Sequence, residues 1–283
     1  MDTRPVLFVA LGIIAFIFLM GLMFVHMPMC PPGYYVDGTV CVALGDTQSK
    51  PSWNTVLQSP AYIINLDRSP ERLSIAQQRI AEAGYTDIRR FRGVDGKKDD
   101  ITQAWQEHYP QGTVFTGHTK AFSSLGQHGC MLSWLNLLKH IREGPDDIVT
   151  VFEDDIVFRD SWSLAPTFYD ETPSNFDMIY MGCTTVYAPG TNRIMSVPCF
   201  CTHALLFTRT GAGRVYDYLV SSPVQYPVDE MFYDHSLLAP KQRTYRSYVW
   251  MYKDPNYTFV GDKGLVYQDD VVFPSTIKLS PPV

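Results

Sequence analysis

The chain has 283 residues, a net charge of −6 at pH 7, and aromatic side chains at 13% of its positions. This length accommodates one large domain, or two small ones, with a substantial hydrophobic core. The acidic balance and the lack of any basic run argue against a nucleic-acid partner.

The first feature in chain order is an uncharged apolar stretch at residues 6–25. Twenty residues of helix extend about 30 Å, which matches the hydrocarbon core of a bilayer. Residues 25–29 match a signal-peptidase cleavage site poorly, so a membrane anchor is favoured over a cleaved signal peptide. Arg4 precedes the stretch, and Asp37 and Asp46 follow it. This bias predicts a type II single-pass protein whose bulk is lumenal or extracytosolic, in a Golgi-like or ER-like compartment if the source is eukaryotic or viral.

The cysteines fit an oxidising compartment. Cys30 and Cys41 flank a turn-rich loop just after the anchor, and we expect them to form a disulfide. Cys130 lies in a helical pattern and is expected to be a buried thiol. A second bridge is open to any pair among Cys183, Cys199 and Cys201. The expected organisation is a cytosolic tip and anchor at 1–26, a stem at 27–58, and one large domain at 59–283.

Strands and helices alternate through the large domain. Apolar runs predict strands at 61–66, 88–94, 148–152, 177–181 and 202–208. Helical spacing, with start and stop signals, predicts helices at 70–83, 129–141 and 211–220. Residues 97–124 lack clear periodicity and are expected to form a long loop. This order is typical of an α/β fold, a sandwich with a mostly parallel sheet.

The third predicted strand ends in three consecutive acids, Glu153, Asp154 and Asp155, with no basic neighbour. Like charges repel, and a bound cation relieves that repulsion. Oxygen ligands suit Mn²⁺ or Mg²⁺, although an acidic surface turn is the simpler alternative. Two other predicted strands also lead to an acid, Asp67 and Asp95. Because ligands bind at the carboxyl ends of parallel strands, these acids are expected to share one crevice, which favours metal binding.

No glycine-rich phosphate loop occurs in the sequence. A phosphate-bearing substrate would therefore depend on the metal and on arginines, of which Arg68 and Arg72 are the nearest. Each arginine by itself also suits a solvated position at a helix start.

The order of these motifs resembles glycosyltransferase family 25, which includes lipooligosaccharide and collagen galactosyltransferases. The resemblance covers residues 60–160 and rests on Ile64-Asn65-Leu66-Asp67-Arg68-x-x-Glu71-Arg72, Val94-Asp95-Gly96, Gly129-Cys130-x-x-Ser133 and Val151-Phe152-Glu153-Asp154-Asp155. Looser similarity continues at Pro227-Val228-Asp229 and Leu265-Val266-x-Gln268.

The resemblance implies a GT-A-like α/β/α sandwich, a nucleotide-sugar donor (UDP-galactose is the commonest), and a glycan or protein hydroxyl as acceptor. It implies an inverting transfer assisted by Mn²⁺ or Mg²⁺. The implied metal ligands are Glu153 and Asp155, with His235, or alternatively His203, completing the set. Asp229 is the candidate base, although an acid at a helix start is the simpler interpretation. The implied donor-binding residues are Asn65, Asp67, Arg68, Arg72, Asp95 and Asp154.

Two other functions fit the pattern. One is a non-catalytic, membrane-anchored relative that binds a glycan or a partner. Trp134 supports it, because many family members carry His after the serine that corresponds to Ser133. The other is a metal-dependent phosphoesterase, which needs ligands for a second ion. The motif around Asn65 argues against that alternative.

Overall fold

The computed structural model describes residues 50–112, 124–172, 174, 176–182, 199–222, 224, 227–232, 264–269 and 272, and the backbone of 34–37, 40–43, 183–185, 194–195, 249–252 and 261–262. The chain divides into two compact units, Met1–Ser49 and Lys50–Val283. In the first unit, β1 (Tyr34–Asp37) pairs antiparallel with β2 (Val40–Ala43).

The predicted membrane anchor and the predicted Cys30–Cys41 bridge lie outside the described side chains. Within the part of the chain that is described, no helix combines the length and the apolar character needed to cross a membrane.

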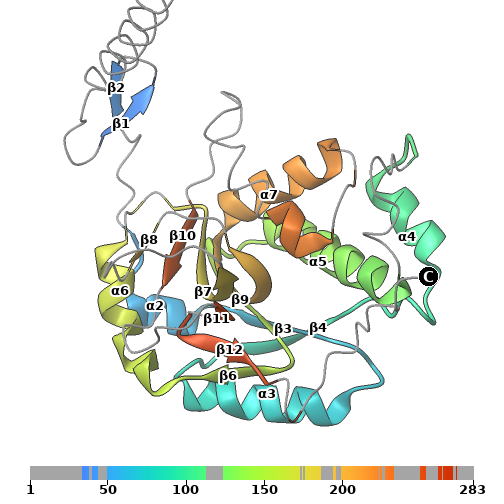
Figure 1. Cartoon of the computed structure of the whole chain (residues 1–283), viewed down its shortest axis with the longest axis horizontal. Helices are drawn as coiled ribbons and strands as arrows, with labels where there is room; N and C mark the ends of the chain where they lie inside the picture. Colours follow the sequence, from blue (N-terminus) through green and yellow to red (C-terminus); the bar gives the residue numbers. More distant parts are fainter. Residues whose placement is uncertain are drawn as a thin grey trace, which may run out of the picture. The chain divides into compact units, whose positions relative to one another are not determined.

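The second unit is built on a mixed sheet with the strand order β4-β3-β5-β9-β7-β10-β8, and β11 also pairs with β7 (Figure 1). Its strands are β3 (Ala61–Asn65), β4 (Ile88–Arg92), β5 (Ile148–Glu153), β7 (Met178–Thr185), β8 (Ile194–Met195), β9 (Phe200–Thr208), β10 (Val249–Tyr252) and β11 (Gly261–Asp262). Of these described strands, β3, β4, β5, β7 and β10 point one way, and the other three point the opposite way. The mostly parallel character predicted from the sequence is therefore confirmed.

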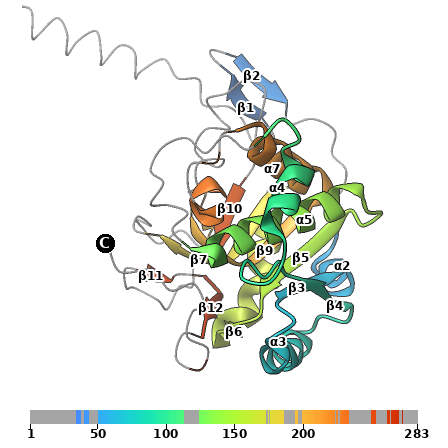
Figure 2. The same ribbon diagram turned by 90° about the vertical axis from the view of Figure 1, so that its right-hand side faces the viewer.

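Helices cover both faces of the sheet (Figures 1 and 2). The described helices are α2 (Trp53–Gln58), α3 (Pro70–Glu82), α4 (Ile101–His108), α5 (Leu125–Glu143), α6 (Ala165–Glu171) and α7 (Arg209–Ser221), with a 3₁₀ turn at Asp160–Leu164. A small antiparallel pair, β6 (Ile156–Phe158) and β12 (Val266–Gln268), adjoins the sheet.

Side-chain alternation along the strands divides the core into two layers. On β5, Val149 and Val151 pack with α5 and α7, whereas Ile148 and Phe152 pack with α2, α3 and α6. Strand β3 repeats the pattern, with Tyr62 in the first layer and Ile63 in the second. Both faces of these strands are covered by helices, which explains why their sequences are continuous apolar runs.

Two elements differ from the prediction. Strand β9 runs antiparallel between β5 and β7. Residues 101–108, expected to lie in a loop, form α4, in which Asp100 caps the first turn and Trp105 and His108 are buried. A helix of eight residues holds too few apolar positions to show periodicity, so its packing on α5 decides its structure. Residues 113–123 of the same expected loop lie outside the description.

The second unit begins with residues 50–58, which are predicted from the sequence to lie in the stem and which include α2. Val56 is fully buried, and the ring of Trp53 lies 5.4 Å from that of Tyr169 and 5.6 Å from that of Trp162. Lys50 donates to the carbonyl of Thr172, 2.6 Å away, at the end of α6. Residues 50–58 are therefore part of the packed second unit.

Candidate active site

A cavity lies at the carboxyl ends of β3, β4 and β5, where the sequence predicts a shared crevice. Its described lining comes from the ends of β3 and β5, from the loops after the three strands, from α3 and the first three turns of α5, and from β12. The lining residues are Ile64, Asn65, Leu66, Arg68, Ser69, Arg72, Val94, Asp95, Gly96, Lys97, Gly126, Cys130, Ser133, Trp134, Glu153, Asp154, Asp155 and Gln268.

Close packing of α5 against the loop after β4 shapes one wall. A Cβ atom on Gly96 would lie 1.7 Å from the Leu125 carbonyl oxygen, and one on Gly129 would lie 2.4 Å from the Val94 carbonyl oxygen. The Ser133 hydroxyl accepts from the Val94 amide at 2.8 Å and donates to the Gly129 carbonyl at 2.6 Å. The motifs Val94-Asp95-Gly96 and Gly129-Cys130-x-x-Ser133 thus form one contact, which directs the Asp95 loop toward the cavity.

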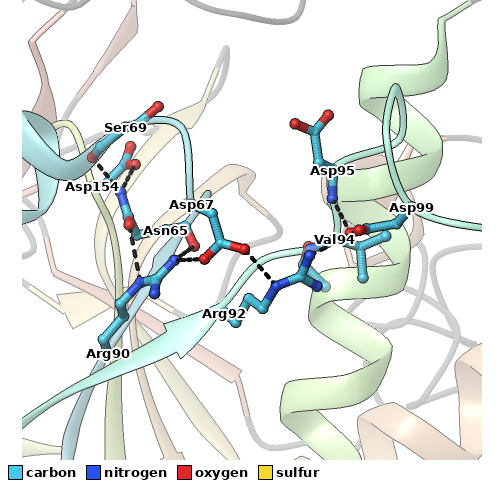
Figure 3. Close-up of polar contacts among 10 residues, drawn as sticks. Asn65, Asp67, Ser69, Arg90, Arg92, Val94, Asp95, Asp99 and Asp154 are labelled. Atoms are coloured by element: carbon cyan, nitrogen blue, oxygen red, sulfur yellow. Dashed lines mark hydrogen bonds and ion pairs between the residues drawn. The ribbon is translucent and has the colours of Figure 1, made fainter.

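Asn65 organises the opposite wall (Figure 3). Its side-chain amide donates to the Ser69 carbonyl at 2.9 Å and to Asp154 Oδ2 at 2.7 Å, and its Oδ1 accepts from Arg90 Nε at 3.1 Å. Both amide hydrogens are used, since an Asn side chain has two. Asn65 therefore positions Asp154 and the start of α3.

Arg72 is shared by two acids of the triplet. Its terminal nitrogen lies 2.5 Å from Asp154 Oδ1 and 2.9 Å from Asp155 Oδ2. The second oxygen of Asp155, Oδ1, is buried and has no hydrogen-bond partner. An ionised oxygen in that state is costly, so the site favours either a proton or a cation there.

Glu153 is held by two neutral donors. Thr202 Oγ1 donates to Glu153 Oε1 at 2.8 Å, and Gln268 Nε2 donates to Oε2 at 3.1 Å. Thr202 follows Cys201, whose φ of +66° is in the left-handed region. The pairing of β9 with β7 is also irregular near this point, and such irregularities re-aim side chains toward functional sites.

The pKa values of the acids reflect this crowding. Burial raises the pKa of Glu153 to about 8, and repulsion from Asp155, Asp154 and Asp229 adds to the effect. Burial also raises the pKa of Asp155 to about 6, although Arg72 and Gln268 oppose it. For Asp154, burial again prevails over Arg72 and Asn65, and the pKa is raised.

These residues fit part of a site for a hard divalent cation. Glu153 and Asp155 would supply oxygen ligands, and a cation there would interact with the Asp155 oxygen that has no hydrogen-bond partner. The described side chains include no group of three or more His, Cys, Asp or Glu residues that could hold a metal ion. The third predicted ligand, His235, lies outside the described residues. The alternative, His203, is buried away from the cavity lining, where its Nε2 donates to the Val266 carbonyl at 3.1 Å.

The structure does not bring Asp67 into the cavity. Asp67 is exposed and pairs with Arg90 and Arg92, whose hydrogen bonds lower its pKa (Figure 3). Arg92 also contacts Asp99 at 2.8 Å, and Asp99 accepts from the Asp95 amide at 2.8 Å. Asp67 thus supports the Asp95 loop indirectly.

The remaining predicted residues lie at or near the cavity. Arg68 pairs with Asp95 across it; burial opposes the ionisation of Asp95, but Arg68 prevails and the pKa of Asp95 is lowered. Asp229 lies in the helical segment 228–232 and is not among the described lining residues. It is near enough for its charge to raise the pKa of Glu153 and of the Cys130 thiol.

Sequence reasoning did not assign a site role to Lys97, Thr202 or Gln268. Lys97 directly follows the Val94-Asp95-Gly96 motif, which is the signal that points to it. Gln268 ends the Leu265-Val266-x-Gln268 pattern. No local pattern marks Thr202, since its role depends on the pairing of β9 with β5.

One cysteine prediction is partly resolved. Cys199 is disulfide-bonded, and its partner lies outside the described side chains. Cys130 and Cys201 carry thiols. Cys130, expected to be buried, is half-buried and lines the cavity, and desolvation raises the pKa of its thiol.

A protein-family model described as "Glycosyltransferase family 25 (LPS biosynthesis protein)" matches residues 58–232. The match spans more than half of the 283 residues and covers most of the described cavity lining. The class of protein that it defines is the glycosyltransferases, which are enzymes. The chain belongs to glycosyltransferase family 25.

Solved structures give weak matches. The apo-form glycosyltransferase GlyE of Streptococcus pneumoniae TIGR4 is 9% identical, with 67% of this chain and 44% of that chain covered and a TM-score of 0.35. The galactosyltransferase LgtC, solved with donor and acceptor sugar analogues, is 15% identical, with coverage of 63% and 70% and a TM-score of 0.34. The mannosyltransferase PcManGT from Pyrobaculum calidifontis, solved with GDP-Man and Mn²⁺, is 15% identical, with coverage of 74% and 60% and a TM-score of 0.35. No curated protein sequence matches the chain.

Proposed function

We propose that this enzyme transfers a hexose, with galactose as the first candidate, from a UDP-sugar to a hydroxyl group of a glycan or protein. The proposed reaction depends on Mn²⁺ or Mg²⁺ and inverts the anomeric configuration, on a GT-A-like fold. The observation that carries the proposal is the buried Asp155 oxygen without a partner, at a strand end inside the cavity of a glycosyltransferase domain.

The cavity presents charges of both signs, as a metal-assisted diphosphate site requires. Glu153 and Asp155 are the proposed metal ligands, while Arg68 and Lys97 line the same cavity and suit phosphate oxygens. A divalent ion would stabilise the negative charge that develops on the diphosphate leaving group. Arg72 holds Asp155 in place by sharing its guanidinium with Asp154.

Inverting transfer requires a base that removes the proton from the acceptor hydroxyl. We assign this role to Asp229. Support comes from its position near Glu153, since its charge contributes to the raised pKa of that acid. An acid beside the metal ligands, but not among the lining residues of the donor cavity, suits a position on the acceptor side.

The rival function is a non-catalytic relative that keeps the fold. Trp134 favours it, because this side chain is 1% exposed, lines the cavity, and packs against Phe207 and Phe232 with ring distances of 6.2 and 5.2 Å. A large apolar side chain there replaces a polar group that many family members carry.

We also propose a type II topology with residues 50–283 outside the cytosol. The uncharged stretch at 6–25 and the disulfide at Cys199 support it, because such bridges persist in oxidising compartments. Protease protection in sealed membrane vesicles tests this topology. Digestion of residues 50–283 by protease added on the cytosolic side would contradict it.

The test of activity uses the purified full-length chain and a panel of nucleotide sugars. Release of the nucleoside diphosphate is measured with Mn²⁺ or with a chelator, for wild type, Asp155→Asn and the exposed control Asp160→Asn. We expect Mn²⁺-dependent release from one sugar nucleotide and a loss of about 100-fold or more in Asp155→Asn, because one charged ligand is removed. The control should retain wild-type release.

Two outcomes would count against the proposal. Equal release with metal and with chelator would refute metal dependence. Absence of release from every donor, together with absence of Mn²⁺-dependent UDP binding in calorimetry, would favour the non-catalytic relative.

A further inference from the structure

The acidic triplet contacts a segment far along the chain, beyond the family match at 58–232. Strand β12 pairs antiparallel with β6, and this register places Gln268 opposite Ile156. The amide of Asp269 donates to the carbonyl of Asp155 at 2.7 Å. Figures 1 and 2 show β6 and β12 side by side. Segment 264–269 thus lies directly on the turn that carries the acids.

Close backbone packing determines where this segment lies. A Cβ atom on Gly264 would lie 2.4 Å from Gly182 Cα, and one on Gly182 would lie 2.4 Å from the Val266 carbonyl oxygen. The Leu265 amide donates to the Met181 carbonyl at 2.7 Å, and His203 donates to the Val266 carbonyl. Contacts this short leave little freedom, so β7 and β9 determine the position of β12.

Arg79 of α3 secures the far end of the segment. Its guanidinium lies 2.9 Å from Asp269 Oδ2 and donates to the Ile156 carbonyl at 2.9 Å. One side chain therefore ties β6 to the residue after Gln268.

The side chain of Gln268 reaches the cavity from this fixed backbone. Its amide donates to Glu153 Oε2 at 3.1 Å. A primary amide carries two hydrogens and no charge. It can orient a carboxylate without neutralising it, and the carboxylate oxygen keeps a lone pair for another ligand.

We propose that Gln268 is a positioning residue of the active site, whose amide orients Glu153 for the divalent cation. The inference rests on the proposed function, since it concerns the same metal-dependent donor site. Groups that orient metal ligands typically change metal affinity or activity by about 10- to 100-fold when removed.

The experiment compares Gln268→Met with Gln78→Met in the full-length chain. Gln78 donates to Glu82 at 2.8 Å on the exposed side of α3, so the control removes a Gln–Glu hydrogen bond outside the site. Calorimetry measures UDP affinity across a Mn²⁺ series, and thermal unfolding of the metal-free protein reports folding. We expect Gln268→Met to weaken Mn²⁺-dependent UDP binding about 10- to 100-fold, with the metal-free Tm close to that of wild type, and Gln78→Met to bind as wild type does.

The outcomes separate this inference from the proposed function. Wild-type binding together with unchanged binding by Gln268→Met overturns the role of Gln268 alone. No Mn²⁺-dependent UDP binding by wild type overturns both. If Gln268→Met does not fold, Gln268→Asn replaces it, because the shorter side chain keeps the amide but loses about one carbon–carbon bond of reach. Wild-type affinity in Gln268→Asn then overturns the inference, and a similar weakening supports it.

Discussion

Single residues in the site compensate the charges of acids that are largely shielded from water. Asp154 and Asp155 are at most 9% exposed, and both depend on one guanidinium, that of Arg72. Removing one partner of a buried ion pair leaves an uncompensated charge, which costs more than the pair contributes to stability. Arg72 therefore serves stability as well as the arrangement of the site.

Arg72→Met should reduce the free energy of unfolding by about 3 kcal/mol near neutral pH. Urea unfolding of the metal-free protein measures it, and added Mn²⁺ should restore part of the loss by supplying positive charge. The control Arg142→Met removes an exposed pair with Asp217, whose side chain is 42% exposed, and should change stability by less than about 1 kcal/mol. Equal effects of the two substitutions would show that Arg72 does not compensate buried charge.

At the scale of elements, the site depends on how closely α5 approaches the loop after β4. Gly96 and Gly129 leave no room for a Cβ atom, and Ser133 links the same two elements. Ser124 and Gln127 form a capping box that starts α5 beside the cavity. The glycines of the family motif are thus packing positions, whose consequence is the placement of Asp95.

Gly129→Ala should destabilise the protein by about 2–3 kcal/mol, because the new methyl group overlaps the Val94 carbonyl. It should also weaken UDP binding by shifting the Asp95 loop. Gly213→Ala in α7 is the matched control, since the nearest atom to its Cβ is Arg142 Cγ at 3.5 Å. There the alanine should stabilise the helix by about 0.5–1 kcal/mol. Chemical denaturation of both variants measures the contrast, and stabilisation of Gly129→Ala would refute the packing argument.

At the scale of the whole domain, a buried histidine joins the helices on one face of the sheet. His108 of α4 contacts Asn136 of α5 at 2.8 Å and Tyr216 of α7 at 3.1 Å. Burial lowers its pKa, the charge of Lys139 acts in the same direction, and Asn136 and Glu107 oppose it. Folding therefore favours the neutral form of the His108 side chain.

This histidine predicts a loss of stability in mild acid. The unfolded chain protonates histidine near pH 6.5, whereas folded His108 resists protonation, so the unfolded state binds more protons as the pH falls below about 6.5. The contribution of neutral His108 to stability is complete above about pH 6.5, and it decreases as the pH falls toward the lower pKa of the folded state. Urea midpoints between pH 7.5 and 5.5 should fall more steeply for wild type than for His108→Gln. Parallel curves would rule out this contribution.

Much of the fold follows from the sequence alone, because its signals are local. The apolar runs of β3 and β5, the Ser69-Pro70 start of α3, and the left-handed stop at Gly84, whose φ is +101°, depend on neighbours within a few residues. The acids after β5 also belong to a local motif. These features identify the family and the edge of the sheet where the site lies.

Tertiary structure alone decided how that edge is used. The Asn65 amide donates to Asp154, whereas Asp67 points outward and pairs with Arg90, although both residues belong to one sequence motif. Thr202 and Gln268 reach Glu153 from 49 and 115 residues away. Partners that distant leave no periodic signal, because their meeting depends on strand direction and register, which are set by packing across the whole sheet. The sequence thus identified most of the carboxylates that gather at the site, whereas the folded chain excluded Asp67 and determined which donors hold the others.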